Sequence, residues 1–495
     1  MPTPRLRSRR VTLLLGVASG ALATGLLAAG IAAAHDSPGT VAAAPRAAVS
    51  ATPGQTTTLS GVSFKLRWKP TDAAAMTALD RLVADRRTAM KAVSLRDVAA
   101  DRTDLRRLTW KNSGCSSTAR SAVAALDARI KVGAWCPDYR SGKNDEGTAN
   151  WIPQGVAISR GAAFDGLALS WYHLKDPNAA EPVTDMARLT VGTRPEVNKT
   201  GGYHAVQLAI PTRDASGKVV AKDVDIRLGE AGTGTGTAAG AGAGGMGAQG
   251  VAEAPQHAGG LSIVGNYAYL PDTSAGLRVY DLRRTYRITP GGGLGVGSDG
   301  KFHAHGERYV LFEVGRYVID QKATGTCPAW KTKPSALNKQ LCFSTVSYDP
   351  SYPTPSLLTA EYKLSGGVGS ARPMRVVRWP LAANGTLAAS GGVVTSKVVY
   401  GTVTPNVQGV AGFYKAGQGA TIYYSVSGGG AVRPGTIFSD RAGRNPFSIV
   451  GVIGGESFAY DHYSGGDRIW GVTEHAGKRM VFWAYRKNLQ PKGDG

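Results

Sequence analysis

The 495-residue chain is poor in charged side chains and in cysteine. Charged residues make up 19% of it and hydrophobic residues 42%, a balance that excludes a disordered, charge-dense tail. The four cysteines form no C-x-x-C motif, and no Cys/His spacing indicates a zinc site. Only one long apolar run lacks charge, at residues 11–34, which excludes a protein that crosses a membrane many times.

Familiar catalytic and nucleotide-binding motifs are also missing. The nearest approach to the serine-hydrolase pattern G-x-S-x-G is Gly454-Gly455-Glu456-Ser457-Phe458, which lacks the third glycine and is typical of a turn before a strand. The Gly/Ala-rich segment 229–250 has no Walker lysine and no strand–helix context. We therefore expect this segment to be a surface insertion that buries no apolar side chains.

Residues 1–34 predict a signal peptide, because a basic start precedes an uncharged stretch of Gly, Ala and Leu that ends in three alanines. The pair Arg9-Arg10 resembles a twin-arginine export signal; an ordinary Sec signal or an uncleaved anchor is the alternative. Cleavage would remove four arginines and leave 461 residues (495 − 34) with a charge of +18 (22 − 4). We expect a secreted or envelope-associated protein, with membrane contact only if the segment stays attached.

The chain has 57 Lys+Arg against 35 Asp+Glu. This excess suits anionic partners, yet the basic residues are scattered as on a solvated surface, so no specific nucleic-acid site is expected. The expected partners are another protein, a cell-wall polymer or a small ligand.

An even number of cysteines in an exported chain predicts two disulfides. Local pairing of Cys115 with Cys136 and of Cys327 with Cys342 would close loops of about 20 and 15 residues. The two other pairings of the four cysteines remain open.

The first part of the chain predicts a linker and a small helical region. Residues 35–60 are rich in Ala, Pro, Ser and Thr, as linkers are. Residues 61–150 are expected to be mainly helical, with helices over 72–92 and 117–130 and the first disulfide. Whether this region is independent or clamps the rest stays open.

From Trp151 onward, short apolar stretches alternate with turn residues, and we expect eighteen strands. The segment at 151–157, WIPQGVA, is echoed by NVQGVA at 406–411, and each is followed by an aromatic-rich strand. Further copies begin at residue 257 and at residue 457. Repeats of three or four strands every 40–60 residues or so predict propeller blades.

The segment GNYAYLPD…GLRVYDL at 265–282 resembles the blades of LVIVD-type and NHL-type β-propellers, and the whole chain resembles exported actinobacterial proteins. The resemblance implies a mainly β fold, a β-propeller over 151–490 preceded by the helical region. Five to seven blades fit, and six are favoured. The strand that closes the ring stays open, with 61–68 as one candidate.

The first strand of each blade begins at the central channel, so the resemblance places one residue per blade there. Gln154, His257 and Gln408 align at this position, and His303 and His305 precede another strand. Together with Asn406 and Glu456, these residues predict a channel ligand site or a divalent metal site for calcium or zinc. The more favoured interpretation is that Gln and His hydrogen-bond buried backbone or water.

Two acid–histidine neighbours, Asp461-His462 and Glu474-His475, are interpreted as turn residues, because adjacent strand residues face opposite ways. Aromatic residues in the middle strands are expected to pack between blades. These residues are Trp171, Tyr172, Tyr423, Tyr424, Trp470 and Trp483.

The favoured hypothesis for function is a non-enzymatic binding or interaction module of the cell exterior. The alternative is a metal-assisted propeller hydrolase or lyase that acts at the channel mouth. A third hypothesis is an envelope-tethered structural protein.

Overall fold

The computed structural model describes residues 52–161, 163–173, 186–196, 199–213, 219–223, 259–273, 276–320, 341–362, 373–463 and 466–491. All described residues belong to one compact unit, Arg46–Gly495. The expected signal peptide, most of the expected linker, the 229–250 segment, His257 and Cys327 lie outside the described residues.

The described chain is mainly β, as expected, and its strands form five antiparallel groups in chain order. The first group is β6 (Trp151–Arg160), β7 (Asp165–His173), β8 (Ala187–Gly192) and β9 (Gly201–Arg213), extended by β10 (Val219–Asp223). The second is β11 (Ser262–Val264), β12 (Tyr267–Asp272), β13 (Gly276–Arg287) and β16 (Tyr309–Ile319).

The other three groups follow the same order of pairing. The third is β17 (Phe343–Asp349), β18 (Ser356–Glu361), β19 (Met374–Pro380) and β21 (Val398–Thr402). The fourth is β22 (Val407–Lys415), β23 (Gly419–Val426), β24 (Pro434–Arg441) and β25 (Phe447–Ile453). The fifth is β26 (Gly455–Asp461), β27 (Arg468–Thr473) and β28 (Val481–Tyr485).

Strands from the first part of the chain complete these groups. β5 (Val132–Cys136) pairs with β28, and β4 (Arg106–Trp110) pairs with β5 and β9. β1 (Thr57–Thr58) pairs with β21, β2 (Lys65–Pro70) with β16 and β20 (Val393–Thr395), and β3 (Lys91–Ala92) with β13. Outer-strand pairs such as parallel β9–β16 join three groups into one nearly closed sheet.

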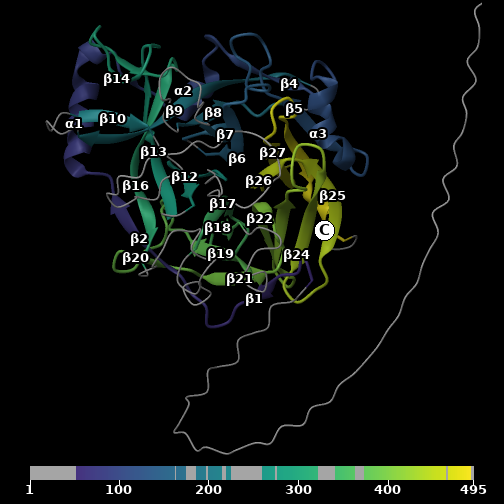
Figure 1. Ribbon diagram of the computed structural model, residues 1–495. Helices are drawn as coiled ribbons and strands as arrows, with labels where there is room; N and C mark the ends of the chain where they lie inside the picture. Colours follow the sequence, from purple (N-terminus) through teal and green to yellow (C-terminus); the bar gives the residue numbers. More distant parts are fainter. Residues whose placement is uncertain are drawn as a thin grey trace, which may run out of the picture. The chain divides into compact units, whose positions relative to one another are not determined.

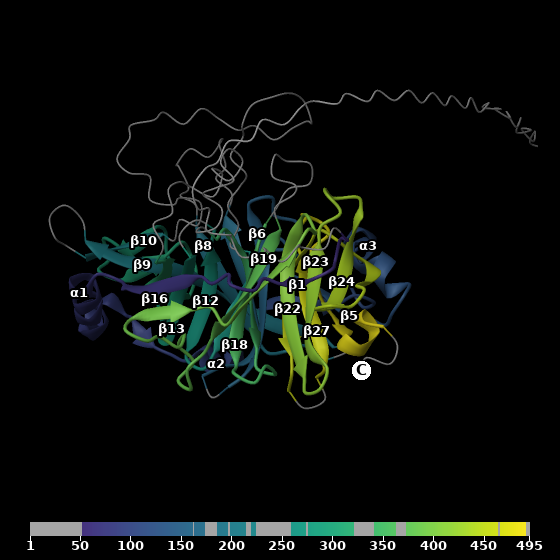
Figure 2. The same ribbon diagram turned by 90° about the horizontal axis from the view of Figure 1, so that it is seen from below.

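The first strands of the five groups, here called the inner strands, contact one another in a circle. β6 packs against β26, β26 against β22, β22 against β17, β17 against β11, and β11 against β6. Figure 1 shows β6, β12, β17, β22 and β26 gathered at the middle of the view, with β24, β25 and β16 farther out. Figure 2, from below, shows the strands standing upright beside one another.

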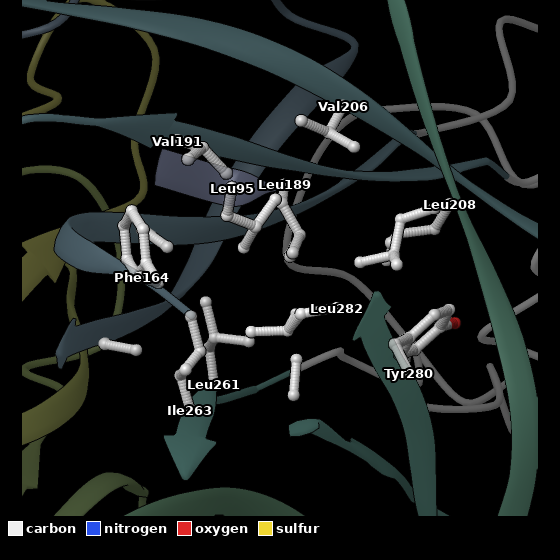
Figure 3. Packing of buried hydrophobic residues seen from close by; sticks show 14 of the residues in the cluster. Leu95, Phe164, Leu189, Val191, Val206, Leu208, Leu261, Ile263, Tyr280 and Leu282 are labelled. Atoms are coloured by element: carbon white, nitrogen blue, oxygen red, sulfur yellow. The ribbon is translucent and has the colours of Figure 1, made fainter. Parts of the chain in front are cut away.

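Apolar side chains fill each junction between neighbouring groups. Five of the apolar clusters among the described residues each join two groups: first with second, second with third, third with fourth, fourth with fifth, and fifth with first. Figure 3 shows the first of these, where Leu189 and Leu208 face Tyr280 and Leu282. The six aromatic residues expected to pack between sheets are all buried in these clusters.

The helices lie in the part of the chain where they were expected, with shorter bounds. α1 is Ala73–Ala84, and its N-cap Asp72 accepts a 2.8 Å hydrogen bond from the Ala75 amide. α1 ends before Asp85, whose own side chain caps the short 3₁₀ helix Arg86–Thr88. α2 is Leu95–Ala100 and α3 is Ser117–Asp127, which packs on β25. The hairpin of β14 (Leu294–Val296) and β15 (Phe302–Ala304) packs near β10.

The disulfide Cys115–Cys136 is confirmed, with the two Cα atoms 5.8 Å apart. It ties the residue before α3 to the last residue of β5. Cys342 is buried and disulfide-bonded. Among the described residues, no helix has both the length and the apolar character needed to cross a bilayer.

Candidate functional site: a carboxyl pair at the inner strands

Four inner strands carry a bulge near their start. The strand register skips Gln154 in β6, Ser344 in β17, Gln408 in β22, and Glu456 with Ser457 in β26. A bulged residue is left out of the ladder, so its side chain can point away from the sheet face that its neighbours share. All five of these side chains are buried. The sequence alignment of Gln154 with Gln408 therefore matches the structure, because each residue is the bulged residue of the inner strand in its group, the first and the fourth.

Glycines beside the bulges let the inner strands approach closely. A Cβ atom on Gly409 would lie 2.5 Å from the carbonyl oxygen of Glu456, and one on Gly155 would lie 2.4 Å from the carbonyl carbon of Gly260. No side chain fits at such distances, which explains the glycine after the glutamine in both echoed segments. The close approach sets the polar residues of neighbouring strands next to one another.

Glu456 shares a buried site with Glu474. The chain brings Glu474 there because its amide donates to the Gly454 carbonyl at 3.0 Å, which holds the loop after β27 over the start of β26. Glu456 is 1% exposed, whereas the Glu474 side chain is 18% exposed. Burial raises the pKa of Glu456 well above its usual range, and the charge of Glu474 and a hydrogen bond to it raise that pKa further. Burial therefore favours the protonated form of Glu456.

Three further side chains surround this pair, and with it they form what we call the axial cluster: Gln154, Tyr362, Glu456, Glu474 and His475. The Gln154 amide donates to Glu474 Oε2 at 3.3 Å. His475 Nε2 lies 3.8 Å from Glu474 Oε1, and its side chain is 23% exposed. Burial raises the pKa of Tyr362, and the charges of both glutamates add to the rise. The cluster is therefore buried at Glu456 and reaches solvent at Glu474 and His475.

A buried arginine lies behind the cluster. Arg479 donates through Nε to the Glu474 carbonyl at 2.9 Å and through Nη1 to the Asp145 carbonyl at 2.8 Å. Burial lowers the pKa of Arg479 to about 10. Burial also raises the pKa of the neighbouring Glu146, against the charge of Arg479. Arg479 thus fixes the backbone of the Glu474 loop and offsets part of its negative charge.

Several buried oxygen atoms near the inner strands have no donor within the described part of the chain. In the axial cluster these are Gln154 Oε1 and both Glu456 carboxyl oxygens, apart from the proton of the carboxyl pair. The inner strands carry more of them, on Ser262, Thr345, Ser347 and Ser457. Buried polar atoms without partners are costly, and they commonly mark a site for water, an ion or a ligand.

The other expected site residues lie in different surroundings. Gln408 is buried at its bulge, next to the Glu456 backbone that Gly409 approaches. Asn406 precedes β22 with a left-handed φ of 54°, and its carbonyl accepts from the Ser427 amide at 3.0 Å. It serves as a turn residue here.

His303 and His305 belong to the β14–β15 hairpin rather than to an inner strand. The two ring nitrogens of His303 are both hydrogen-bonded at 2.9 Å, one to the Thr289 carbonyl and one to Asp299. A metal at His303 would have to displace one of these partners. Since His257 lies outside the described residues, the structure gives no view of the third expected histidine.

Within the described residues, no group of three or more His, Cys, Asp or Glu side chains is arranged to hold a metal. The axial cluster offers two carboxyl groups and one amide oxygen instead. Oxygen ligands of this kind suit calcium, whereas zinc prefers nitrogen and sulfur. The described residues fit an oxygen-bound cation better than zinc.

Sequence reasoning missed three members of the cluster. The sequence led to Glu474 and His475 being interpreted as turn residues, and Tyr362 is not among the expected site residues. None of the three lies on an inner strand, so an alignment of strand starts cannot find them. The one available signal was the Glu474-His475 pair itself.

No protein-family model and no curated protein matches the chain. Among solved structures, it is similar to a glycoside hydrolase-like protein from Parabacteroides distasonis, at 8% identity and a TM-score of 0.29, over 71% of this chain and 97% of that one. It is also similar to the PQQ-bound aldose sugar dehydrogenase of Streptomyces coelicolor, at 11% identity and a TM-score of 0.21, over 80% of this chain and 98% of that one. At TM-scores this low, neither likeness carries an argument about fold or activity.

Proposed function

We propose that the chain is an exported five-bladed β-propeller that acts as a non-enzymatic binding module, with a calcium ion at its axial cluster. Five strand groups, five apolar junctions and a circle of inner strands support the fold. Five blades lie within the expected range, one fewer than the favoured six. Support for export comes from the sequence of residues 1–34 and from the disulfide, a bond typical of oxidising compartments.

One observation carries the binding proposal: Gln154 Oε1 and the Glu456 carboxyl group are buried with no partner beyond the proton of the carboxyl pair, beside the partly exposed Glu474. An oxygen-bound cation would satisfy these atoms together and, in place of the proton between the two carboxyl groups, would offset their negative charges. Glu456, Glu474 and Gln154 Oε1 would hold the ion.

Calcium titration by calorimetry tests the proposal on the exported full chain. We expect about one calcium per chain, and at least tenfold weaker binding in Glu456→Gln, because each carboxylate supplies charge that an amide lacks. Glu196→Gln, at an exposed glutamate whose side chain is 70% accessible, is the matched control and should bind as the wild type does. Equal binding by the Glu456→Gln and Glu196→Gln variants, or no binding by the wild type, would refute the calcium site.

The alternative function is a metal-assisted hydrolase or lyase. The observation in its favour is the carboxyl pair itself, because a proton-holding Glu456 beside a more exposed Glu474 resembles a general acid next to a general base. A panel of p-nitrophenyl esters, phosphates and glycosides separates the two functions. Hydrolysis that requires calcium and disappears in Glu474→Gln would favour the enzyme, and calcium binding without hydrolysis of any panel member would favour the binding module.

A further inference from the structure

A second polar site lies away from the axial cluster, in a pocket of about 680 Å³. The segment before β4, the loop after β5 and the connection between β8 and β9 form its walls. This volume is in the range of small-molecule sites. We call it the basic pocket, because its charged lining residues are Arg102, Arg106, Arg107, Arg140, Lys143, Arg194 and Lys199 against Asp104 and Glu196.

The lining carries a net charge of +5, from seven basic and two acidic residues (7 − 2). A concave surface with one sign of charge concentrates ligands of the opposite sign. Three of the seven basic residues are paired with buried acids behind the wall, Asp138, Asp145 and Asp461, which offset part of this charge.

Three arginines of the pocket are fixed by buried acids. Arg106 pairs with Asp145 at 3.1 Å, Arg194 with Asp461 at 3.1 Å, and Arg140 with Asp138 at 2.5 Å. The three carboxylates are 3% exposed or less. Ion pairs anchored on buried acids hold the arginines in place, so the pocket wall is rigid before any ligand arrives.

Two basic groups are paired only at the surface. Lys143 pairs with Asp104, and Lys199 pairs with Glu196 at 2.5 Å. The Lys199–Glu196 pair is about 70% exposed on both sides. Exposed ion pairs of this kind contribute on the order of 1 kcal/mol or less, and an incoming anion can displace the acidic partner.

Arg102 and Arg107 have exposed side chains for which no ion pair or hydrogen bond occurs within the described residues. The Arg107 backbone is fixed, because its amide donates to Asp138 at 2.9 Å. An exposed guanidinium on a fixed backbone retains all five donors for a ligand, and its planar fork matches the geometry of phosphate and carboxylate groups.

We propose that the basic pocket binds an extracellular polymer that carries repeated phosphate or carboxylate groups, with Arg102 and Arg107 as its direct contacts. A single small anion would occupy only a fraction of the pocket and face few of its charges. A chain of anions can contact the two free arginines and the displaceable lysines at once. The proposal is independent of the calcium site, since the two sites share no residue.

The experiment measures binding of the exported full chain to polyphosphate, polygalacturonate and neutral dextran at near-physiological salt. The double variant Arg102→Gln/Arg107→Gln is compared with Arg129→Gln/Arg433→Gln, which removes two exposed arginines outside the pocket. We expect at least about tenfold weaker polyanion binding in the first double variant and little change in the second, because charge-assisted contacts are lost only in the first.

The polymer that binds identifies the chemistry. Binding to polyphosphate alone assigns phosphate, binding to polygalacturonate alone assigns carboxylate, and binding to both assigns a general oxyanion site. Three results would overturn the proposal: no binding to either polyanion, equal losses in the two double variants, or equally strong binding to dextran.

Discussion

Glu456 occupies a position where a carboxylic acid is costly, because it is 1% exposed and faces a second glutamate. Most buried ionisable groups among the described residues have an opposite charge beside them, as Arg378 has Asp349 at 2.7 Å and Arg375 has Glu361 at 2.5 Å. Glu456 has an acid instead. A side chain with such an environment points to a role in binding or chemistry rather than in stability.

Asp440 gives a test at the residue scale. This carboxylate is 2% exposed and accepts a hydrogen bond from the Thr56 amide. Burial raises the pKa of Asp440 from 3.8 to about 6, against the hydrogen bonds from Thr56. The folded protein therefore holds this proton more tightly than the unfolded chain does, so stability from Asp440 is present at low pH and is lost as pH rises from about 4 to about 6.

The variant Asp440→Asn removes this titration and keeps an oxygen acceptor for Thr56. We expect the difference in melting temperature, variant minus wild type, to increase from pH 4 to pH 7 and then to level off. Thermal melts at each pH measure this difference in melting temperature. The exposed variant Asp165→Asn is the control for the loss of one negative charge. A difference that is flat, or that decreases with pH, would contradict the assigned shift.

At this scale, the sequence predicts those site residues that occupy equivalent positions in repeated strands. Gln154, Gln408 and Glu456 follow from the position of strand starts, and the structure places all three at bulges of inner strands. Glu474 and Tyr362 enter the cluster through loops whose path depends on tertiary contacts, such as the hydrogen bond from Glu474 to Gly454. No local pattern encodes such a contact.

At the scale of elements, the glycines of the inner strands decide how closely neighbouring groups approach. Gly409→Ala would place a methyl group 2.5 Å from the Glu456 carbonyl oxygen and 2.8 Å from the Phe458 amide nitrogen. Backbone atoms cannot move aside without shifting β22 from β26. Overpacking of this kind typically costs about 1–3 kcal/mol, and we expect the upper part of that range.

Urea unfolding of Gly409→Ala measures this cost. Gly292→Ala is the control, because a Cβ atom there meets nothing within 4 Å, and a change within about 0.5 kcal/mol is expected. If the two alanine variants are equally stable, the inner strands are not in close contact at Gly409.

The elements themselves were only partly predictable. Helical periodicity located α1 and α3, but α1 ends at Ala84 because Asp85 caps a separate turn. The echo of Gln-Gly located the first and fourth groups, whereas the third escaped the comparison because β17 has Ser344-Thr345 at the bulge. The bulge of β17 is thus formed by other residue types than the Gln-Gly of β6 and β22.

At the scale of the whole molecule, the ring is closed by strands that are far apart in sequence. β28 near the C-terminus pairs with β5, and Phe482 lies opposite Ala134. The expected candidate, residues 61–68, instead contributes β2, which pairs with the outer strand β16. Sequence periodicity predicts strands but does not identify their partners across hundreds of residues, so the closing pair was left open.

The disulfide Cys115–Cys136 stabilises this closure, because Cys136 is the last residue of β5. The two cysteines are 21 residues apart, so a chain-entropy argument gives about 3 kcal/mol for the bond. We expect Cys115→Ser/Cys136→Ser to lower the free energy of unfolding by that amount in denaturant titrations. An unchanged midpoint and slope would show that the closing strand does not depend on the disulfide.

The most direct test of the account is a crystal structure of the full chain grown with calcium and examined for anomalous scattering. We predict five inner strands in a circle and a calcium peak about 2.3–2.6 Å from oxygens of Glu456, Glu474 and Gln154. A map with no peak at these oxygens, or with Gln154 and Glu456 on separate sides of the molecule, would contradict it.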